Sequence, residues 1–147
     1  MKAETCFADT NLFLRFLTND IPEQADKVEA LLHHAAKGEV ELVTTSLVIA
    51  EIIWTLESYY RVPKSEIQDK MLAILNTPGL VVDGTDLLQQ AAVWYAEKNT
   101  DFIDAYNAAW MLKHEVEKAF TFDQKHFKRF QGIDAQLPEN FNESRRT

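Results

Sequence analysis

The chain has 147 residues, of which 46% are hydrophobic and 26% are charged, a composition typical of one folded domain and not of a disordered segment. Its formal net charge of -8 argues against a broad basic surface for nucleic acid, although a nuclease that binds a cation through acidic side chains is not excluded. No apolar run approaches the roughly 18 residues that a membrane span needs, no secretory signal is visible, and the single cysteine, Cys6, excludes an internal disulfide, so we expect a cytoplasmic protein without a membrane anchor.

Hydrophobic periodicity and turn residues divide the chain into alternating strands and helices. We expect, in chain order, a strand at 4–8, helices at 11–17 and 22–37, a strand at 40–45, helices at 46–60 and 64–76, a strand at 80–82, helices at 87–99 and 102–116, and a strand at 119–123. Strands separated by helical segments imply a parallel sheet. The predicted fold is therefore α/β, a three-layer α/β/α sandwich with a central, mainly parallel sheet of four or five strands. This domain spans 1–137, and 138–147 form a polar tail.

Acidic residues fall near the carboxyl ends of the predicted strands. Asp9 follows the first strand, Asp123 closes the fourth, and Glu51 lies less than two turns into the helix after the second. Asp101 and Asp104 begin another helix and, three residues apart, share one face of it. Because ligands of parallel sheets gather beyond the carboxyl ends of the strands, these five carboxylates could approach one place.

Several carboxylates in one place require a compensating positive charge. No lysine or arginine adjoins Glu51, Asp101 or Asp104 in the sequence. Mg²⁺ and Mn²⁺ take oxygen ligands from a few carboxylates, water and substrate phosphate, and such ions promote phosphodiester hydrolysis. The acids therefore indicate a metal-dependent hydrolase, in which Glu51, within the apolar segment LVIAEIIWTL, would point from its helix into the metal site.

Four motifs in order resemble the PIN domain, in particular the VapC-type ribonuclease toxins of bacterial toxin-antitoxin pairs. They are F-A-D-T-N near the N-terminus, a lone glutamate about forty residues later, D-F-I-D-A-Y-N-A-A from position 101, and T-F-D near the end. The resemblance covers about residues 5–135. It implies a Mg²⁺- or Mn²⁺-dependent endoribonuclease with an RNA substrate and an antitoxin partner. Together with the many apolar residues of helices 46–60 and 64–76, it also implies a homodimer.

The resemblance also assigns roles to individual residues. It implies that four carboxylates are catalytic and bind the metal, with Asp101 as an additional carboxylate: Asp9, Glu51, Asp104 and Asp123. Asn11 matches a small polar residue beside the first aspartate, and Thr121 matches a hydroxyl that orients the site.

Basic residues near these acids are candidates for RNA contact. Lys125, Lys128 and Arg129 follow Asp123 and could hold RNA phosphates or form a solvated helix face. Arg15 could contact phosphate or pair with a carboxylate. The histidines His114 and His126 are interpreted as surface residues.

Each acid also has a simpler interpretation. Asp9 and Asp101 could cap helices, Glu51 could face solvent or a basic partner, and Asp123 could end its strand in a turn. On that interpretation the chain is a non-catalytic interaction protein of the same fold, with helix 46–60 as a docking surface. A stand-alone PIN nuclease without an antitoxin is a further alternative.

Overall fold

The computed structural model describes residues 3–141, and its elements follow the predicted alternation of strands and helices. In chain order they are β1 (Glu4–Phe7), α1 (Thr10–Thr18), α2 (Pro22–Ala36), β2 (Val40–Thr44), α3 (Ser46–Ser58), α4 (Lys64–Leu75), β3 (Leu80–Val82), α5 (Thr85–Glu97), α6 (Phe102–Lys113), β4 (Lys118–Phe120), α7 (Gln124–Phe127) and β5 (Asp134–Gln136). The short α7 and β5 are additions to the predicted elements. Most of the predicted tail, from 142 onward, lies outside the described residues. None of the helices within 3–141 combines the length and apolar character of a membrane span.

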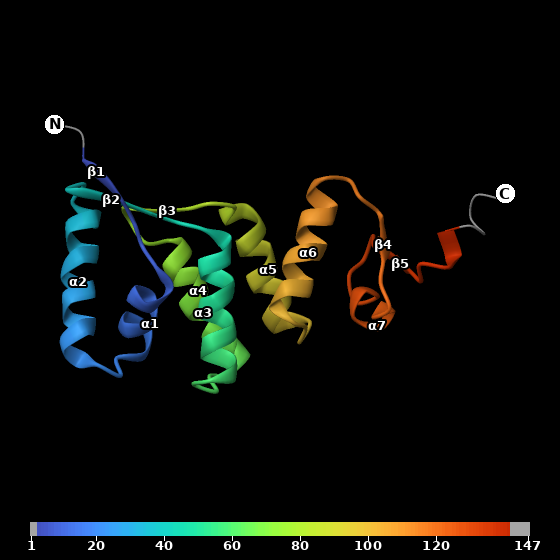
Figure 1. Cartoon of the computed structure of the whole chain (residues 1–147), viewed down its shortest axis with the longest axis horizontal. Helices are drawn as coiled ribbons and strands as arrows, with labels where there is room; N and C mark the ends of the chain where they lie inside the picture. The colour runs from blue at the N-terminus through green and yellow to red at the C-terminus, as the bar shows by residue number, and fades with distance from the viewer. Residues whose placement is uncertain (1–2, 142–147) are drawn as a thin grey trace.

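All strand pairs among the described residues are parallel, which confirms the α/β class, but the strands are divided between two sheets. The larger sheet has the order β1-β2-β3, with Cys6 opposite Leu42 and Leu42 opposite Leu80. β4 pairs with β5 in a separate two-stranded sheet (Figure 1). The predicted four or five strands therefore do not form one continuous sheet within this chain. The reason is that α5 packs against α4 and α6 against α5, so this helical pair carries β4 past the sheet.

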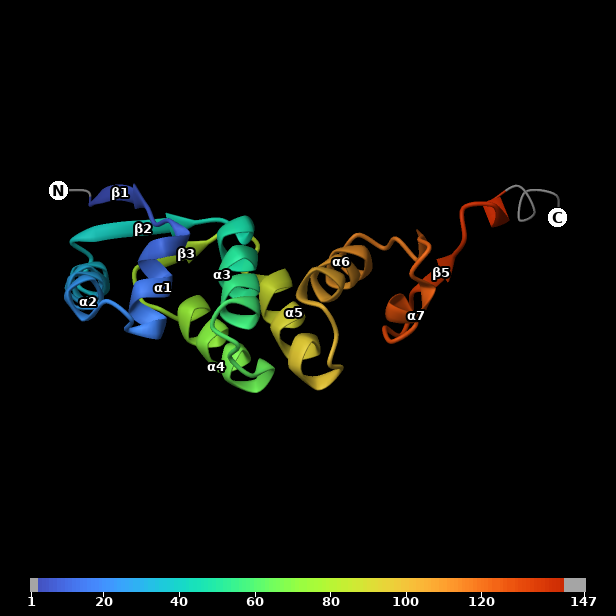
Figure 2. The same ribbon diagram turned by 60° about the horizontal axis from the view of Figure 1, so that its bottom comes forward.

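The two faces of the larger sheet differ in their cover. Helices α1 to α4 lie on one face (Figure 2), where Leu42, Leu80 and Val82 are buried. Because side chains alternate along a strand, the next row in register, Phe7, Val43 and Val81, points to the other face. Phe7 is 57% exposed and Val81 56% exposed. An apolar row across all three strands is thus open to solvent in this chain.

The core is centred on α3. Its residues Ile49, Ile52 and Leu56 are almost fully buried, and burial of each such side chain contributes about 1.5–3 kcal/mol to stability. Glu51 lies on the exposed side of the same helix, near the exposed Trp54. Glu51 is therefore not part of the buried apolar face of α3, although its neighbours in the sequence are apolar. Because α3 is apolar on nearly every side, its sequence does not reveal which side meets the core.

Gly79 lies in the turn before β3, where the backbone packs closely against the end of α2. Its φ is +80°, and a Cβ built on it would lie 2.2 Å from the carbonyl oxygen of Ala35. Its own carbonyl accepts a hydrogen bond of 2.9 Å from the Leu42 amide. Only glycine fits this position, because a side chain would suffer both backbone strain and a collision with α2.

Gly79→Ala is expected to lower the free energy of unfolding by about 3 kcal/mol, the combined effect of left-handed strain and overpacking. The matched control is Gly38→Ala, because Gly38 has a φ of +79° but open space around its Cβ direction. The control should lose only about 1 kcal/mol. Urea unfolding of both variants measures the difference, and equal losses would contradict the close approach of α2.

Candidate metal centre

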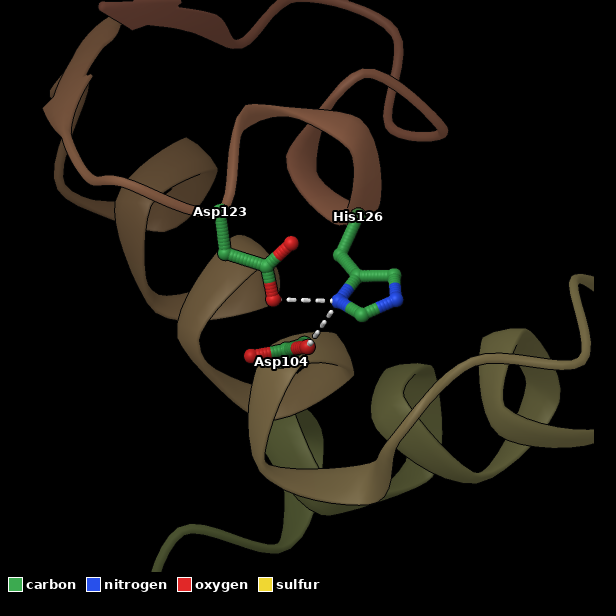
Figure 3. Close-up of side chains that lie close together, drawn as sticks. All are labelled: Asp104, Asp123 and His126. Atoms are coloured by element: carbon green, nitrogen blue, oxygen red, sulfur yellow. Dashed lines mark hydrogen bonds and ion pairs between the residues drawn. The ribbon is translucent and has the colours of Figure 1, made fainter. Parts of the chain in front are cut away.

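The start of α7 and the start of α6 bring two carboxylates and one imidazole together (Figure 3). Asp123 occupies the N-cap position of α7, and His126 lies three residues further on. Asp104 lies in the first turn of α6. One ligand atom from each of the three side chains lies within 4.8 Å of the other two. Within the described part of the chain, these three side chains are close enough together that they could hold a metal ion.

His126 connects the two carboxylates. Its Nδ1 forms a hydrogen bond with the Asp123 carboxylate and lies 3.8 Å from Asp104 Oδ2. Thr121 fixes the preceding turn, because its Oγ1 accepts a hydrogen bond of 2.9 Å from the Asp123 amide. Thr121 therefore contacts Asp123 directly, and the expectation that its hydroxyl orients the site stays a prediction.

The cluster concentrates negative charge. Burial raises the pKa of the Asp104 carboxyl above its ordinary value, and the nearby charges of Asp101 and Asp123 raise it further, while His126 acts in the opposite direction. A cation bound between the carboxylates would relieve this repulsion. The donor set fits the expected ions, because Mg²⁺ and Mn²⁺ prefer carboxylate oxygens and the imidazole can act as a hydrogen-bonding partner of those ligands.

Asp101 acts as a helix cap. Its carboxylate accepts a hydrogen bond of 2.8 Å from the Ile103 amide at the start of α6, as the simpler interpretation proposed. Asp101 also lines a cleft of about 300 Å³ between α3 and α6, and Glu51 lies on the opposite wall of that cleft. Glu51 is therefore a neighbour of the α6 terminus, although it is not part of the three-residue group.

Asp9 lies in a different part of the fold. It occupies the N-cap position of α1 with extended backbone, and its side chain makes no capping hydrogen bond there. In both overall views, α3, α5 and α6 lie between α1 and α7 (Figures 1 and 2). Because β4 is not beside β1, the carboxyl ends of these two strands do not meet. The predicted convergence of Asp9 and Glu51 with Asp104 and Asp123 is therefore not found within the described chain.

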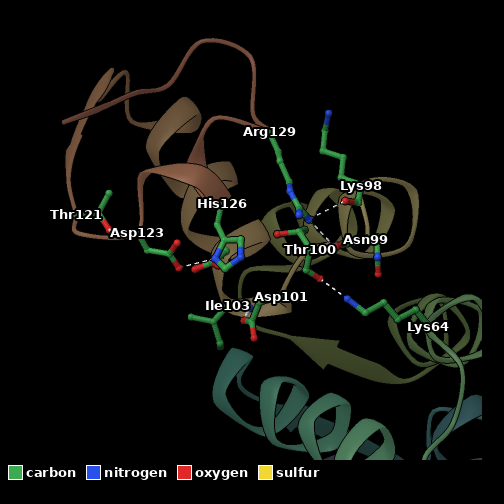
Figure 4. Close-up of polar contacts among 11 residues, drawn as sticks. Lys64, Lys98, Asn99, Thr100, Asp101, Ile103, Thr121, Asp123, His126 and Arg129 are labelled. Atoms are coloured by element: carbon green, nitrogen blue, oxygen red, sulfur yellow. Dashed lines mark hydrogen bonds and ion pairs between the residues drawn. The ribbon is translucent and has the colours of Figure 1, made fainter. Parts of the chain in front are cut away.

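Two of the predicted RNA-contact residues have structural partners. Arg15 forms an ion pair of 3.2 Å with Asp20 and donates to Gln24. Arg129 donates to the carbonyl oxygens of Lys98, at 3.2 Å, and Asn99, at 2.7 Å (Figure 4).

The remaining predicted polar residues are exposed. Lys125, within α7, and Lys128, at its C-cap, are exposed and remain candidates for phosphate contact. Asn11 is exposed in the first turn of α1, on the same groove as Arg15.

His126 is the residue that the sequence interpretation missed. It had been treated as a surface histidine, and its side chain is indeed partly exposed. The signal was present in the sequence as D-x-x-H, since residues three apart share a helix face. That signal depends on a helix beginning at Asp123, and α7 is too short to show periodicity.

Comparison with known proteins gives two matches that span most of the chain. The sequence model of the PIN domain family matches residues 6–133. A VapC ribonuclease of Aquifex aeolicus (strain VF5) is 22% identical over 121 residues, which are 82% of this chain and 88% of that protein. The PIN match contains the complete Asp104, Asp123 and His126 cluster, as well as Asp9 and Glu51.

Substitution of the cluster is expected to weaken Mn²⁺ binding. Asp104→Asn and Asp123→Asn each remove a charged oxygen ligand, and His126→Ala removes a hydrogen-bonding partner of such a ligand, so each should lower affinity by about tenfold or more. Asp86→Asn is the matched control, because Asp86 is exposed and paired with Lys113 away from the cluster. Calorimetric titration measures the affinities, and wild-type binding by both aspartate variants would contradict the assignment.

Proposed function

Since the chain belongs to the PIN domain family, we propose that it is a metal-dependent endoribonuclease that hydrolyses phosphodiester bonds in RNA. Its family and order of elements place it in the three-layer α/β/α class. The observation that carries the proposal is the Asp104, Asp123 and His126 cluster inside the PIN match. The similarity to a VapC ribonuclease supports RNA as the substrate.

The residues of the site have distinct roles in this proposal. Asp104 and Asp123 would hold Mg²⁺ or Mn²⁺, which when bound supplies activation of water and stabilisation of the leaving oxygen. His126 orients the Asp123 carboxylate, and Thr121 fixes the turn that carries it. Asp101 fixes the start of α6, and therefore the position of Asp104, by capping the helix.

Two further carboxylates complete the acidic set that the family resemblance implies. Glu51 faces the cleft beside α6, where an exposed carboxylate can accept a hydrogen bond from water. Asp9 makes no capping bond in α1, so its carboxylate is available at the end of β1. On the resemblance we assign Glu51 to the site, whereas Asp9, which lies apart from the cluster in the described chain, would join the site only if the end of β1 met the end of β4.

We further propose that the chain is the toxin of a VapBC-type pair, acting in the cytoplasm and inhibited by an antitoxin protein. The support is the similarity to VapC over most of both chains. An adjacent reading frame encoding a small DNA-binding protein would agree with this proposal. A stand-alone nuclease without such a neighbour is the alternative within the family.

A non-catalytic interaction protein is the second candidate, and one observation favours it. Leu47 and Trp54 are strongly exposed on α3, and Ile103 of α6 is exposed and lines one cleft with Trp54 and a second with Leu47. Exposed apolar side chains grouped around a cleft are typical of protein-binding surfaces. The same surface would also suit an antitoxin, so cleavage activity distinguishes the two functions.

Loss of either clustered aspartate should abolish cleavage. Asp104→Asn and Asp123→Asn are expected to reduce the rate of Mn²⁺-dependent RNA cleavage by about 100-fold or more, and removal of the metal with a chelator should do the same to the wild type. Urea unfolding should show little change, since both side chains are partly exposed. A fluorescently labelled RNA measures the rate, with Asp86→Asn as control. Wild-type cleavage by both variants would show that the cluster is not the active site.

The exposed lysines should contribute to RNA affinity through phosphate contacts. In an Asp123→Asn background, the double variant Lys125→Ala/Lys128→Ala is expected to bind single-stranded RNA more weakly and with a shallower salt dependence, by a log–log slope of about 0.7 for each lost contact. Lys37→Ala, an exposed lysine at the end of α2, is the matched control. Fluorescence anisotropy at several salt concentrations measures the slope, and an unchanged slope would place the RNA elsewhere.

A further inference from the structure

The larger sheet ends at an open strand. Within residues 3–141, β1 pairs with β2 on one side and with no strand on the other. The row formed by Phe7, Val43 and Val81 is open on the same sheet. Parallel sheets are nearly always covered on both faces, and an exposed strand edge beside apolar side chains readily accepts another strand.

Among the described residues, the small sheet formed by β4 and β5 also lacks further neighbouring strands. We call residues 118–136, which contain β4, α7 and β5, the C-terminal unit. Two strands of three residues each are marginally stable by themselves. Phe122 is 83% exposed, and Phe120 is still 54% exposed although its ring contacts Phe141, so this unit also presents exposed aromatic side chains.

The charges of the two surfaces are complementary as well. In a chain of net charge -8, the C-terminal unit has more basic than acidic residues, with Lys118, Lys125, Lys128 and Arg129 against Asp123 and Asp134. The edge strand β1 exposes Glu4, and its neighbour β2 exposes Glu41. Opposite charges at approaching surfaces favour this orientation.

Hydrogen bonds and helix packing hold the C-terminal unit at a distance from the β1 edge of its own chain. Arg129 donates two hydrogen bonds to the carbonyls of Lys98 and Asn99 at the end of α5. Lys64 of α4 donates a bond of 2.8 Å to the carbonyl of Thr100 in the same turn (Figure 4). A return of the unit to its own β1 would require these contacts and the packing of α6 on α5 to rearrange. A second copy of the chain can meet the open edge without such a change.

We propose that two copies exchange their C-terminal units, so that β4 of each copy extends the sheet of the other as a parallel strand beside β1. Such reciprocal exchange gives a closed two-fold dimer. The sheet then has the order β3-β2-β1-β4-β5, and the aromatic residues of the unit come next to the β1 end of the open apolar row, where Phe7 lies. This dimer differs from one formed through α3 and α4.

The exchange also completes the acidic site from two chains. Carboxyl ends of parallel neighbours lie at the same edge of a sheet, so Asp9, directly after β1, meets Asp123 of the other copy, which lies three residues beyond β4. The Asp104, Asp123 and His126 cluster of one copy is thereby joined by Asp9 of the other. This part of the inference rests on the proposed function, whereas the exchange of strands does not.

The native Cys6 in β1 allows a direct test. Adjacent strands lie about 4.8 Å apart, within disulfide reach, so Lys118→Cys, Ala119→Cys and Phe120→Cys sample the β4 register. Under mild oxidation, at least one variant should form a disulfide-linked dimer, and the same substitution combined with Cys6→Ser should not. Glu23→Cys, on α2, is the control for random collisions. A monomeric product with both thiols consumed would show closure within one chain, and absence of any disulfide would exclude the pairing, so either result overturns the proposal.

Mixing two inactive variants tests the composite site. When Asp9→Asn and Asp123→Asn are unfolded and refolded together, each mixed dimer has one intact site, so about a quarter of the wild-type activity should return. Neither variant refolded alone should recover activity. If the mixture stays inactive while wild type refolded in the same way is active, the composite site is excluded. If wild type itself cleaves no RNA, the proposed function fails, and the disulfide experiment still decides the exchange.

Discussion

The direction in which the chain steps across its parallel sheet determines where the other elements lie. β2 lies beside β1 and β3 beside β2, so both crossovers step the same way. Because such crossovers are right-handed in nearly all known proteins, α1 to α4 lie on one face, where Leu42 and Leu80 are buried. Among residues 3–141, the segments after β3 are the ones that could cover the other face. In this chain α5 packs against α4 and α6 contacts α3. The row that includes Phe7 and Val81 therefore stays open.

The strand order also separates the acidic residues from one another. Asp9 follows β1, at the edge of the larger sheet, whereas Asp123 follows β4, which belongs to the smaller sheet. Asp104 joins Asp123 because α6 packs directly against α7. The resulting group is electrostatically unbalanced, since burial and neighbouring carboxylates raise the pKa of Asp104. The contact between α6 and α7 therefore brings Asp104 and Asp123 together. Whether Asp9 joins them depends on whether β4 lies beside β1.

The sequence predicted those features that depend on residues close together along the chain. Strand and helix positions followed from periodicity, and a cap made by Asp101 was one of the two roles that its place before a helix allowed. The exposure of Glu51 could not be predicted, because α3 is apolar on most sides and only tertiary packing selects its buried face. The pairing of β4 could not be predicted either. A strand of three residues has too little pattern to specify its neighbour.

The hydrogen bonds of the arginines limit how the proposed RNA substrate can be held. Arg15 forms an ion pair with Asp20, and Arg129 donates a hydrogen bond to a carbonyl at the end of α5. Either guanidinium would have to break a structural contact in order to bind phosphate. Lys125 and Lys128 remain, in a chain of net charge -8. Few phosphate contacts release few counterions, so long-range attraction contributes little to binding. On the proposed function, recognition must therefore depend on contacts made within the site itself, which makes the arrangement of its carboxylates the feature that controls both binding and cleavage.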